Sequence, residues 1–196
     1  MRRLRLVVVA LCVSLLALTA GIGATVSEAA FRAEVSAAGR EQMKRDIRAI
    51  DHARGRVRYW RRVMGRPRPH PAVSLRELRR TTPAVTARQR AHWKRRARAV
   101  RRQGMHPPHL AGWRCIRRHE TGPPFPGWRT SSGNGYYGGL QMDRAFQRTY
   151  GRWIYRRKGT ANRWTKWEQI WTAEKARRSG RGFHPWPRTA RACGLL

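Results

Sequence analysis

Two short stretches decide the fold of this chain: residues 113–120 read WRCIRRHE, and residues 133–141 read GNGYYGGLQ. The first belongs to a helix predicted over about 110–120, which Gly122 and the two prolines after it bring to an end. The second is a glycine-rich loop, and glycine lets a backbone take up positive φ and approach a ligand closely. A helix, a loop and further short helices predict an α+β fold that is mainly α.

Glu120 is the candidate for chemistry, because it is the only acidic residue between Glu77 and Asp143 and lies at a helix end. The negative end of the helix dipole disfavours a carboxylate there. Burial against aromatic side chains would raise its pKa further, which is how a carboxylic acid comes to donate a proton near neutral pH. The neighbouring Arg117 and Arg118 act in the opposite direction. Taken alone, a single glutamate is more often a solvated surface residue.

The two stretches together closely resemble resuscitation-promoting factors and related actinobacterial transglycosylase-like domains. More broadly, a helix-terminal glutamate followed by a loop that ends in Gly-Leu-Gln is similar to lytic transglycosylases and goose-type lysozymes. The resemblance covers about residues 109–196. It implies a small lysozyme-like domain that cleaves peptidoglycan between N-acetylmuramic acid and N-acetylglucosamine.

The resemblance also implies roles for single residues. Glu120 matches the family's catalytic glutamate, which acts as a general acid. Substrate contact is implied for the cleft loop, for its glutamine, for the acidic residue behind it and for one tryptophan: Tyr136, Tyr137, Gly138, Gly139, Gln141, Asp143 and Trp128. Ordinary retaining and inverting hydrolases need a second carboxylate. Asp143 is the candidate for that group, and its alternative role is the N-cap of the next helix, predicted to end near Gly151. With Glu120 alone, the substrate's own groups complete the reaction, as in lytic transglycosylases.

The chain departs from the family pattern at several positions. His119 stands where a cysteine is usual, and Cys115 lies one helical turn earlier, on the same face. Thr121 replaces a serine, and Phe146 replaces a threonine found in some relatives. A last helix is predicted from residue 165 to 180, with Glu168 completing a capping box and Glu174 on the solvated face.

The cysteine content points to one disulfide. Of three cysteines, Cys12 lies in an apolar N-terminal segment, which leaves the even pair Cys115 and Cys193. In an oxidising compartment such a pair predicts a bridge, and a loop of about 79 residues would stabilise the fold by about 4–5 kcal/mol. Two unpaired buried thiols are the alternative.

Residues 1–29 have the layout of a signal peptide. Three arginines precede an apolar run from Leu6 to Ala20, and small residues surround position 28. An uncleaved membrane anchor is the alternative. Both interpretations place the rest of the chain outside the cytoplasm, and the predicted location is secreted and associated with the cell wall.

Residues 32–108 carry 23 basic and 5 acidic side chains. Apolar residues at helical spacing from Met43 to Met64 predict one helix, which Gly65 and the prolines after it end. A second helix is predicted from Thr86, with Gln89 completing a capping box, to Gly104. The apolar stripes look too thin for a sizeable core. We therefore expect a basic helical spacer that is partly extended or disordered, and a helical hairpin packed on residues 109–196 is the alternative.

The charge bears on partners rather than on fold. The chain has 44 basic and 10 acidic residues, a net charge of +34. The expected partners are peptidoglycan glycan strands at the cleft and anionic wall polymers along the spacer, with membrane contact only if the N-terminal segment is uncleaved. The alternatives are a non-catalytic wall-binding protein with the same cleft, and a secreted cationic protein that binds nucleic acid or membranes. Nucleic acid is not expected, because the loop lacks the basic and alternating aromatic residues of a stacking platform. The scattered histidines predict no metal site, and no cofactor is expected.

Overall fold

The structure is a computed structural model that describes residues 24–124 and 127–196, with side chains described from residue 36 onward. Most of the predicted signal segment therefore lies outside the described residues, and only its last six residues fall in a described helix. In the part of the chain that is described, no helix combines the length and the apolar character needed to cross a membrane.

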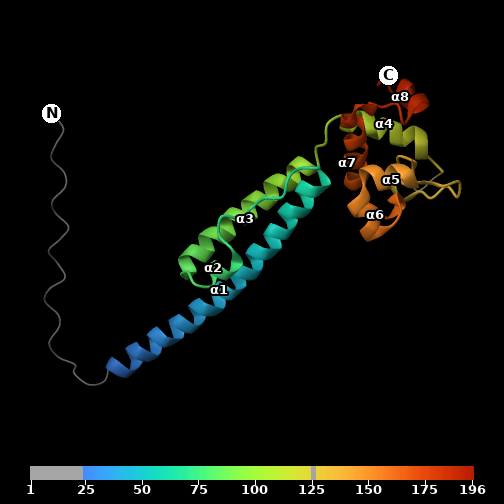
Figure 1. Cartoon of the computed structure of the whole chain (residues 1–196). Coiled ribbons are helices and arrows are strands. Elements are labelled where there is room, and N and C mark those ends of the chain that lie inside the picture. The colour runs from blue at the N-terminus through green and yellow to red at the C-terminus, as the bar shows by residue number, and fades with distance from the viewer. Residues whose placement is uncertain (1–23, 125–126) are drawn as a thin grey trace, which may run out of the picture.

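Three helices form the N-terminal half of the described chain. Helix α1 (Ala24–Val63) and helix α3 (Pro83–Gly104) lie antiparallel and side by side, and the short helix α2 (Leu75–Leu78) is in the connection between them (Figure 1). We call this unit, residues 24–104, the helical hairpin. Helix α1 ends where predicted. Helix α3 begins one turn earlier than predicted, because Thr82 caps it through a hydrogen bond from the Val85 N–H and Pro83 takes its first position.

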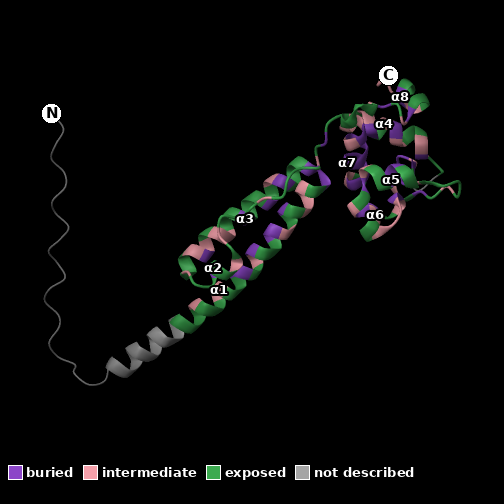
Figure 2. Ribbon diagram, in the orientation of Figure 1, coloured by how far each residue is buried: buried purple, intermediate pink, exposed green. Residues whose placement is uncertain are grey.

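The helical hairpin has a hydrophobic core of its own. The apolar stripe of α1, with Ile50 and Val57 almost fully buried, faces Trp93 and Val100 of α3. Figure 2 shows stretches of ribbon coloured as buried in both α1 and α3, and these include residues of the shared core. Gly104 permits the close approach at the end of α3, because a Cβ there would lie 2.1 Å from the Trp60 ring. The two thin apolar stripes thus bury each other. Because the sequence analysis considered each helix separately, it did not predict this shared core.

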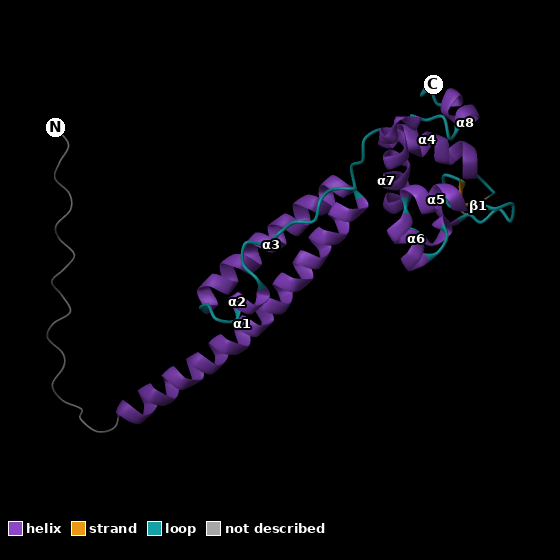
Figure 3. Ribbon diagram, viewed as in Figure 1, coloured by secondary structure: helices purple, strands orange, loops and turns teal. Residues whose placement is uncertain are grey.

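The remaining residues form a second unit, mainly helical with one small sheet (Figure 3). Its long helices are α4 (Leu110–Thr121) and α7 (Lys166–Ala176). The shorter ones are α5 (Arg144–Tyr150), α6 (Arg152–Lys158), α8 (Pro187–Ala192), the 3-10 turns η1 (Gly127–Arg129) and η2 (Ala161–Arg163), and the π-helical turn η3 (Arg177–Arg181). Strands β1 (Tyr136–Tyr137) and β2 (Met142–Asp143) pair antiparallel, with Tyr136 opposite Asp143. The predicted α+β, mainly α fold is confirmed.

A disulfide and a buried aromatic core hold this second unit together. Cys115 of α4 is bonded to Cys193 after α8, with 5.9 Å between their Cα atoms, so the predicted pairing is present in the structure. Trp113 and Ile116 of α4 are fully buried in the same cluster as Trp186. The Trp186 indole N–H donates to the Leu140 carbonyl over 2.6 Å, which fixes the chain directly before β2.

Helix α7 belongs to the second unit and also contacts the helical hairpin. Trp171 is buried in the core of the helical hairpin, and its indole N–H donates to the Gly104 carbonyl over 2.8 Å. The Tyr59 hydroxyl of α1 donates to Glu168 of α7 over 3.0 Å. Of the two arrangements that the sequence left open for residues 32–108, the structure has the packed hairpin. The division of the chain near residue 108 remains a prediction.

One prediction for α7 is wrong and another is confirmed. Glu174, expected on a solvated face, is fully buried and accepts hydrogen bonds from the Trp113 indole N–H at 2.7 Å and from Arg177 at 3.1 Å. A carboxylate tolerates such burial only with donors and a counter-charge around it, and α7 has neighbours on several sides. The capping box of Thr165 and Glu168 is present as predicted.

Candidate active site

Glu120 lies in the last turn of α4, where its side chain is half-buried. The Thr189 hydroxyl of α8 donates to its Oε1 over 2.9 Å. Burial is the largest influence and raises the pKa of Glu120, while the Thr189 hydrogen bond and the charge of His119 oppose it. The pKa of Glu120 is thus shifted in the direction that general acid chemistry requires, and burial rather than the helix end is the cause of the shift. The opposing cation is His119 on the exposed surface, rather than Arg117 or Arg118.

The glycine-rich loop is joined directly to the helix that carries Glu120. The Thr121 hydroxyl donates to the Gly139 carbonyl over 3.0 Å. Gly138 has φ of 79°, a value at which a side chain is strained, and a Cβ there would lie 2.5 Å from Gln169 Oε1. A Cβ on Gly139 would lie 2.7 Å from the Trp128 ring. The two glycines therefore let the loop pass closely over α7 and against Trp128, beside the end of α4.

Gln169 of α7 was missed by the sequence analysis, and it holds this loop in place. Its side chain is fully buried. Its Oε1 accepts from the Gly139 N–H over 2.8 Å, and its Nε2 donates to the Trp128 carbonyl over 2.8 Å and to the Ala161 carbonyl over 2.9 Å. One side chain thus connects three segments that line the same region. Nothing in the local sequence sets Gln169 apart from other polar residues of a helix, and only the tertiary contacts show its role. Thr189 was missed for the same reason.

Gln141 has an unusual backbone for a residue with a side chain. Its φ is 45°, one of two positive values at residues other than glycine in the described chain. Its side-chain amide donates to the Gly138 carbonyl over 2.8 Å. Such a conformation is costly and persists where the surroundings fix it, often at functional sites. Gln141, predicted as a site residue, therefore stabilises the turn of the loop through a hydrogen bond within the loop itself.

The two tyrosines of β1 differ in their surroundings. Tyr136 is 45% exposed, which makes it the largest aromatic surface open to solvent among the described residues. Tyr137 is half-buried, and the guanidinium of Arg144 lies 5.6 Å from its ring centre. An exposed ring beside an amide-rich loop suits contact with the apolar face of a sugar. Trp128 is half-buried against Gly139, so it supports the loop and exposes only part of its ring.

Asp143 is the N-cap of α5. Its Oδ1 accepts a hydrogen bond from the Phe146 N–H over 2.6 Å, and the residue is exposed to solvent. Of the two roles that the sequence allowed, the structure therefore contains the cap. Phe146, where some relatives have threonine, is buried against Trp186. Gly139, Gln169 and Trp128 are in contact with one another, and Glu120 is linked to them through the adjacent Thr121, whereas Asp143 is reached only through the strand pair.

The described residues offer one group of three metal-ligating side chains, Cys115, His119 and Cys193. Its two cysteines are joined in the disulfide, so their sulfur atoms are not thiolates. The side chains that the structure brings together around Glu120 and the glycine-rich loop are a carboxyl group, hydroxyl groups, an amide and an aromatic ring.

Residues 109–189 match the family model of the transglycosylase-like domain. The matched segment contains Glu120, the glycine-rich loop and Asp143, and it ends at Thr189, which donates to Glu120. The match ends before Cys193, and the helical hairpin lies outside it. No curated protein matches the chain. The transglycosylase-like domain indicates peptidoglycan as the substrate and glycosidase or transglycosylase chemistry in general.

Proposed function

We propose that this protein is a secreted enzyme that cleaves the glycosidic bond between N-acetylmuramic acid and N-acetylglucosamine in peptidoglycan, with Glu120 as the proton donor. The observation that carries the proposal is a half-buried carboxyl group of raised pKa at the end of α4, joined through Thr121 and Gly139 to a glycine-rich loop. The likeness to resuscitation-promoting factors belongs to this proposal and supports a role in wall remodelling.

The first step follows from the state of Glu120. Its protonated carboxyl group donates to the glycosidic oxygen, the bond to the leaving sugar breaks, and positive charge develops at the sugar ring as in an oxocarbenium ion. The Thr189 hydroxyl, which already donates to Oε1, remains bound to the carboxylate that is left after proton transfer. Thr189 thus orients the acid before the reaction and stabilises its anion afterwards.

A single acid is the simplest assignment for the described residues. Glu168 and Glu174 are fully buried in polar contacts of α7, and Asp143 caps α5. The reaction then ends when a hydroxyl group of the substrate itself attacks the charged ring carbon, which gives an anhydro sugar, or when water attacks, which gives a free reducing end. In either case the attacking O–H bond breaks and its proton passes to the Glu120 carboxylate, which restores the acid. Mass spectrometry of fragments released from purified peptidoglycan separates the two products by the mass of one water.

The Glu120→Gln variant tests the proposal. Glutamine keeps the Thr189 hydrogen bond through its carbonyl oxygen but has no acidic proton. General acid catalysis contributes about 100-fold to 10,000-fold in rate, so lysis of purified walls should fall by at least about 100-fold. Glu41→Gln is the matched control, because Glu41 is an exposed carboxylate of α1 far along the chain. Lysis by Glu120→Gln at a rate near that of the parent would refute the proposal and favour a cleft that only binds glycan.

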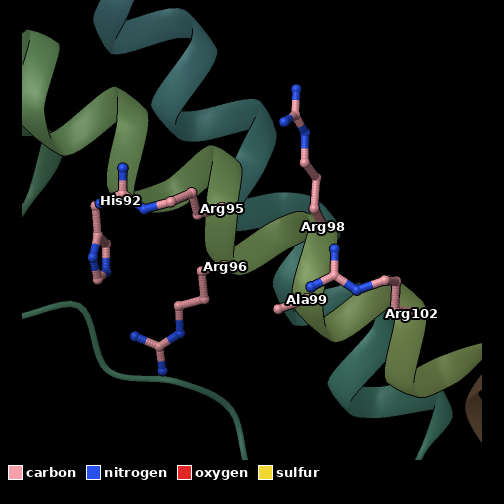
Figure 4. A pocket seen from close by; sticks show the side chains of 6 residues that line it. All are labelled: His92, Arg95, Arg96, Arg98, Ala99 and Arg102. Carbon is pink, nitrogen blue, oxygen red and sulfur yellow. The ribbon is translucent and has the colours of Figure 1, made fainter.

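We further propose that the helical hairpin holds the enzyme on anionic wall polymers. His92, Arg95, Arg96, Arg98 and Arg102 line a shallow hollow on α3 (Figure 4). The side chains of Arg96 and Arg98 extend in opposite directions there, so the face offers spread positive charge rather than a closed pocket. Attraction of this kind acts over a Debye length of about 8 Å at physiological salt.

The wall-binding proposal predicts a steep dependence on salt. Binding to isolated walls should weaken as sodium chloride rises, and replacing Arg95, Arg98 and Arg102 by glutamine should weaken it at low salt without changing cleavage of soluble fragments. The matched control replaces three arginines of the second unit that are equally exposed: Arg148, Arg156 and Arg157. Equal loss in both triple variants would show that total charge, and not the helical hairpin, determines wall binding.

A further inference from the structure

A second cluster of cations lies where the end of α1 meets α7. Arg62 is in the last turn of α1, while Lys175 and Arg178 lie one turn apart at the end of α7 and in η3. Gly65 has no side chain, and the position of a Cβ on it would be 3.2 Å from Lys175 Cε and 3.9 Å from an Arg178 guanidinium nitrogen. The chain after α1 and the end of α7 therefore come together around positive groups.

The charge of this cluster is not compensated by the described residues. Lys175 is mostly buried, and burial, Arg178 and Arg62, in that order, lower the pKa of Lys175 to about 8. The two buried glutamates of α7 pair elsewhere, Glu168 with Lys158 and Glu174 with Arg177. Among residues 36–124 and 127–196, no carboxylate forms an ion pair with Arg62, Lys175 or Arg178.

The aromatic residues around the cluster hold its guanidinium groups in place. Arg62 lies 4.7 Å from the ring centre of Trp153, and Arg178 lies 5.8 Å from that of Trp171. Arg178 also donates to the Met64 carbonyl over 3.3 Å. Arg62 and Arg178 are exposed to solvent, so a ligand can reach both guanidinium groups. Cations held against aromatic rings favour a ligand that supplies negative charge and several acceptor oxygens.

We propose that Arg62, Lys175 and Arg178 bind a phosphate oxyanion between the helical hairpin and α7, and that the bound anion stabilises the contact between them. Guanidinium groups match the geometry of phosphate oxygens, and the partly buried ammonium group of Lys175 gains a counter-charge. Because Arg62 belongs to α1 and the other two residues belong to the segment after residue 166, one anion attracts both units. The ligand is a phosphate group, either free or in the phosphodiester chain of a wall polymer.

The test uses the full chain and inorganic phosphate, with chloride of equal ionic strength as the reference. Calorimetric titration should show saturable binding, and phosphate should raise Tm. Lys175→Met and Arg178→Gln should each weaken binding by about tenfold or more, since each removes a charged donor. Lys175→Met should also raise Tm without phosphate, because it removes a poorly solvated cation beside two others. Arg98→Gln, on the exposed face of α3, is the matched control and should bind phosphate like the parent.

Several outcomes distinguish a specific phosphate site from a general response to net charge. If a short glycerol phosphate oligomer binds more tightly than inorganic phosphate and loses affinity in the same variants, the ligand is a wall polymer; equal affinities indicate free phosphate. A Tm rise no larger than that in chloride overturns the proposal. The proposal is also overturned if Arg98→Gln weakens phosphate binding as much as Lys175→Met and Arg178→Gln do, because binding would then depend on net charge alone. Glu120→Gln should bind phosphate like the parent, so this test does not depend on the proposed activity.

Discussion

Replacing Gln169 by methionine should lower the free energy of unfolding and displace the glycine-rich loop, and both effects can be measured. Methionine has a side chain of the same length as glutamine, but it lacks both the Oε1 acceptor and the Nε2 donor. The Gly139 N–H loses its acceptor, and the Trp128 and Ala161 carbonyls lose a donor, all in a fully buried place. At about 1–3 kcal/mol for each group left unsatisfied, with the carbonyls at the lower end, the free energy of unfolding should fall by about 3–6 kcal/mol.

A matched substitution separates loss of stability from loss of cleft geometry. Gln147 is also fully buried, and its side chain bonds to the Ala161 N–H and the Met142 carbonyl instead of Gly139 and Trp128. Gln147→Met should therefore lose similar stability. Urea unfolding measures both losses, and wall lysis is then compared at low temperature, per folded molecule.

The expected result is unequal activity at similar stability. Gln169→Met should lyse walls at least about tenfold more slowly than Gln147→Met, because misplacing reacting groups by about 1 Å is costly in rate. Parent-like activity per folded molecule in Gln169→Met would refute the view that Gln169 positions the loop. An unchanged urea midpoint would refute the hydrogen-bond energies on which the expected loss of stability depends.

Three further predictions concern the acid, the disulfide and the junction. Because the pKa of Glu120 is raised in the folded state, the folded protein holds this proton more tightly than the unfolded chain does. The stabilisation from this proton is therefore present below pH 4.5 and is lost as pH rises through the folded pKa. The Tm of Glu120→Gln relative to the parent should thus increase from pH 4 to pH 7, and a constant difference would contradict the raised pKa. Replacing both Cys115 and Cys193 by serine should cost about 4–5 kcal/mol in unfolding free energy, and alkylation mass spectrometry of the unreduced protein should find neither Cys115 nor Cys193 alkylated. Trp171→Ala should lower the free energy of unfolding by about 3–5 kcal/mol, measured with urea, because it leaves a cavity in the core of the helical hairpin. A loss below about 1 kcal/mol would mean that the contact between the two units contributes little to stability.

The features predicted correctly from the sequence are those that short-range rules determine. The end of α4 at Gly122, the Asp143 cap and the capping box of Thr165 each depend on residues within one turn of one another. The position of Glu120 follows from the first of these. The cysteine pair followed from counting, because only two cysteines remain outside the apolar N-terminal segment.

The features that were missed depend on what packs against α7. Its sequence mixes Glu, Gln, Thr and Trp, a composition typical of an exposed helix, yet residues 168–174 are all buried. The helix contacts both the helical hairpin and the glycine-rich loop, so Glu168, Gln169 and Glu174 find hydrogen-bond partners in distant segments. Glu168 pairs with Tyr59, Glu174 with Trp113 and Gln169 with Gly139, and the two residues of each pair are at least 30 positions apart in the sequence. No periodicity within the helix contains that information.

Helix α7 therefore makes the helical hairpin relevant to the active site, although the hairpin contributes none of the candidate catalytic residues. Glu168 and Trp171 contact the hairpin, while Gln169, adjacent to Glu168 in sequence, holds Gly139 of the cleft loop. A shift of α7 caused by loss of the hairpin contact would move the Gln169 amide, and with it the loop that the Thr121 hydroxyl joins to the end of α4. Buried, well-packed helices transmit displacements of this kind because their interiors leave little free space. The helical hairpin that we propose to bind anionic polymers therefore also supports, through α7, the loop beside the end of α4.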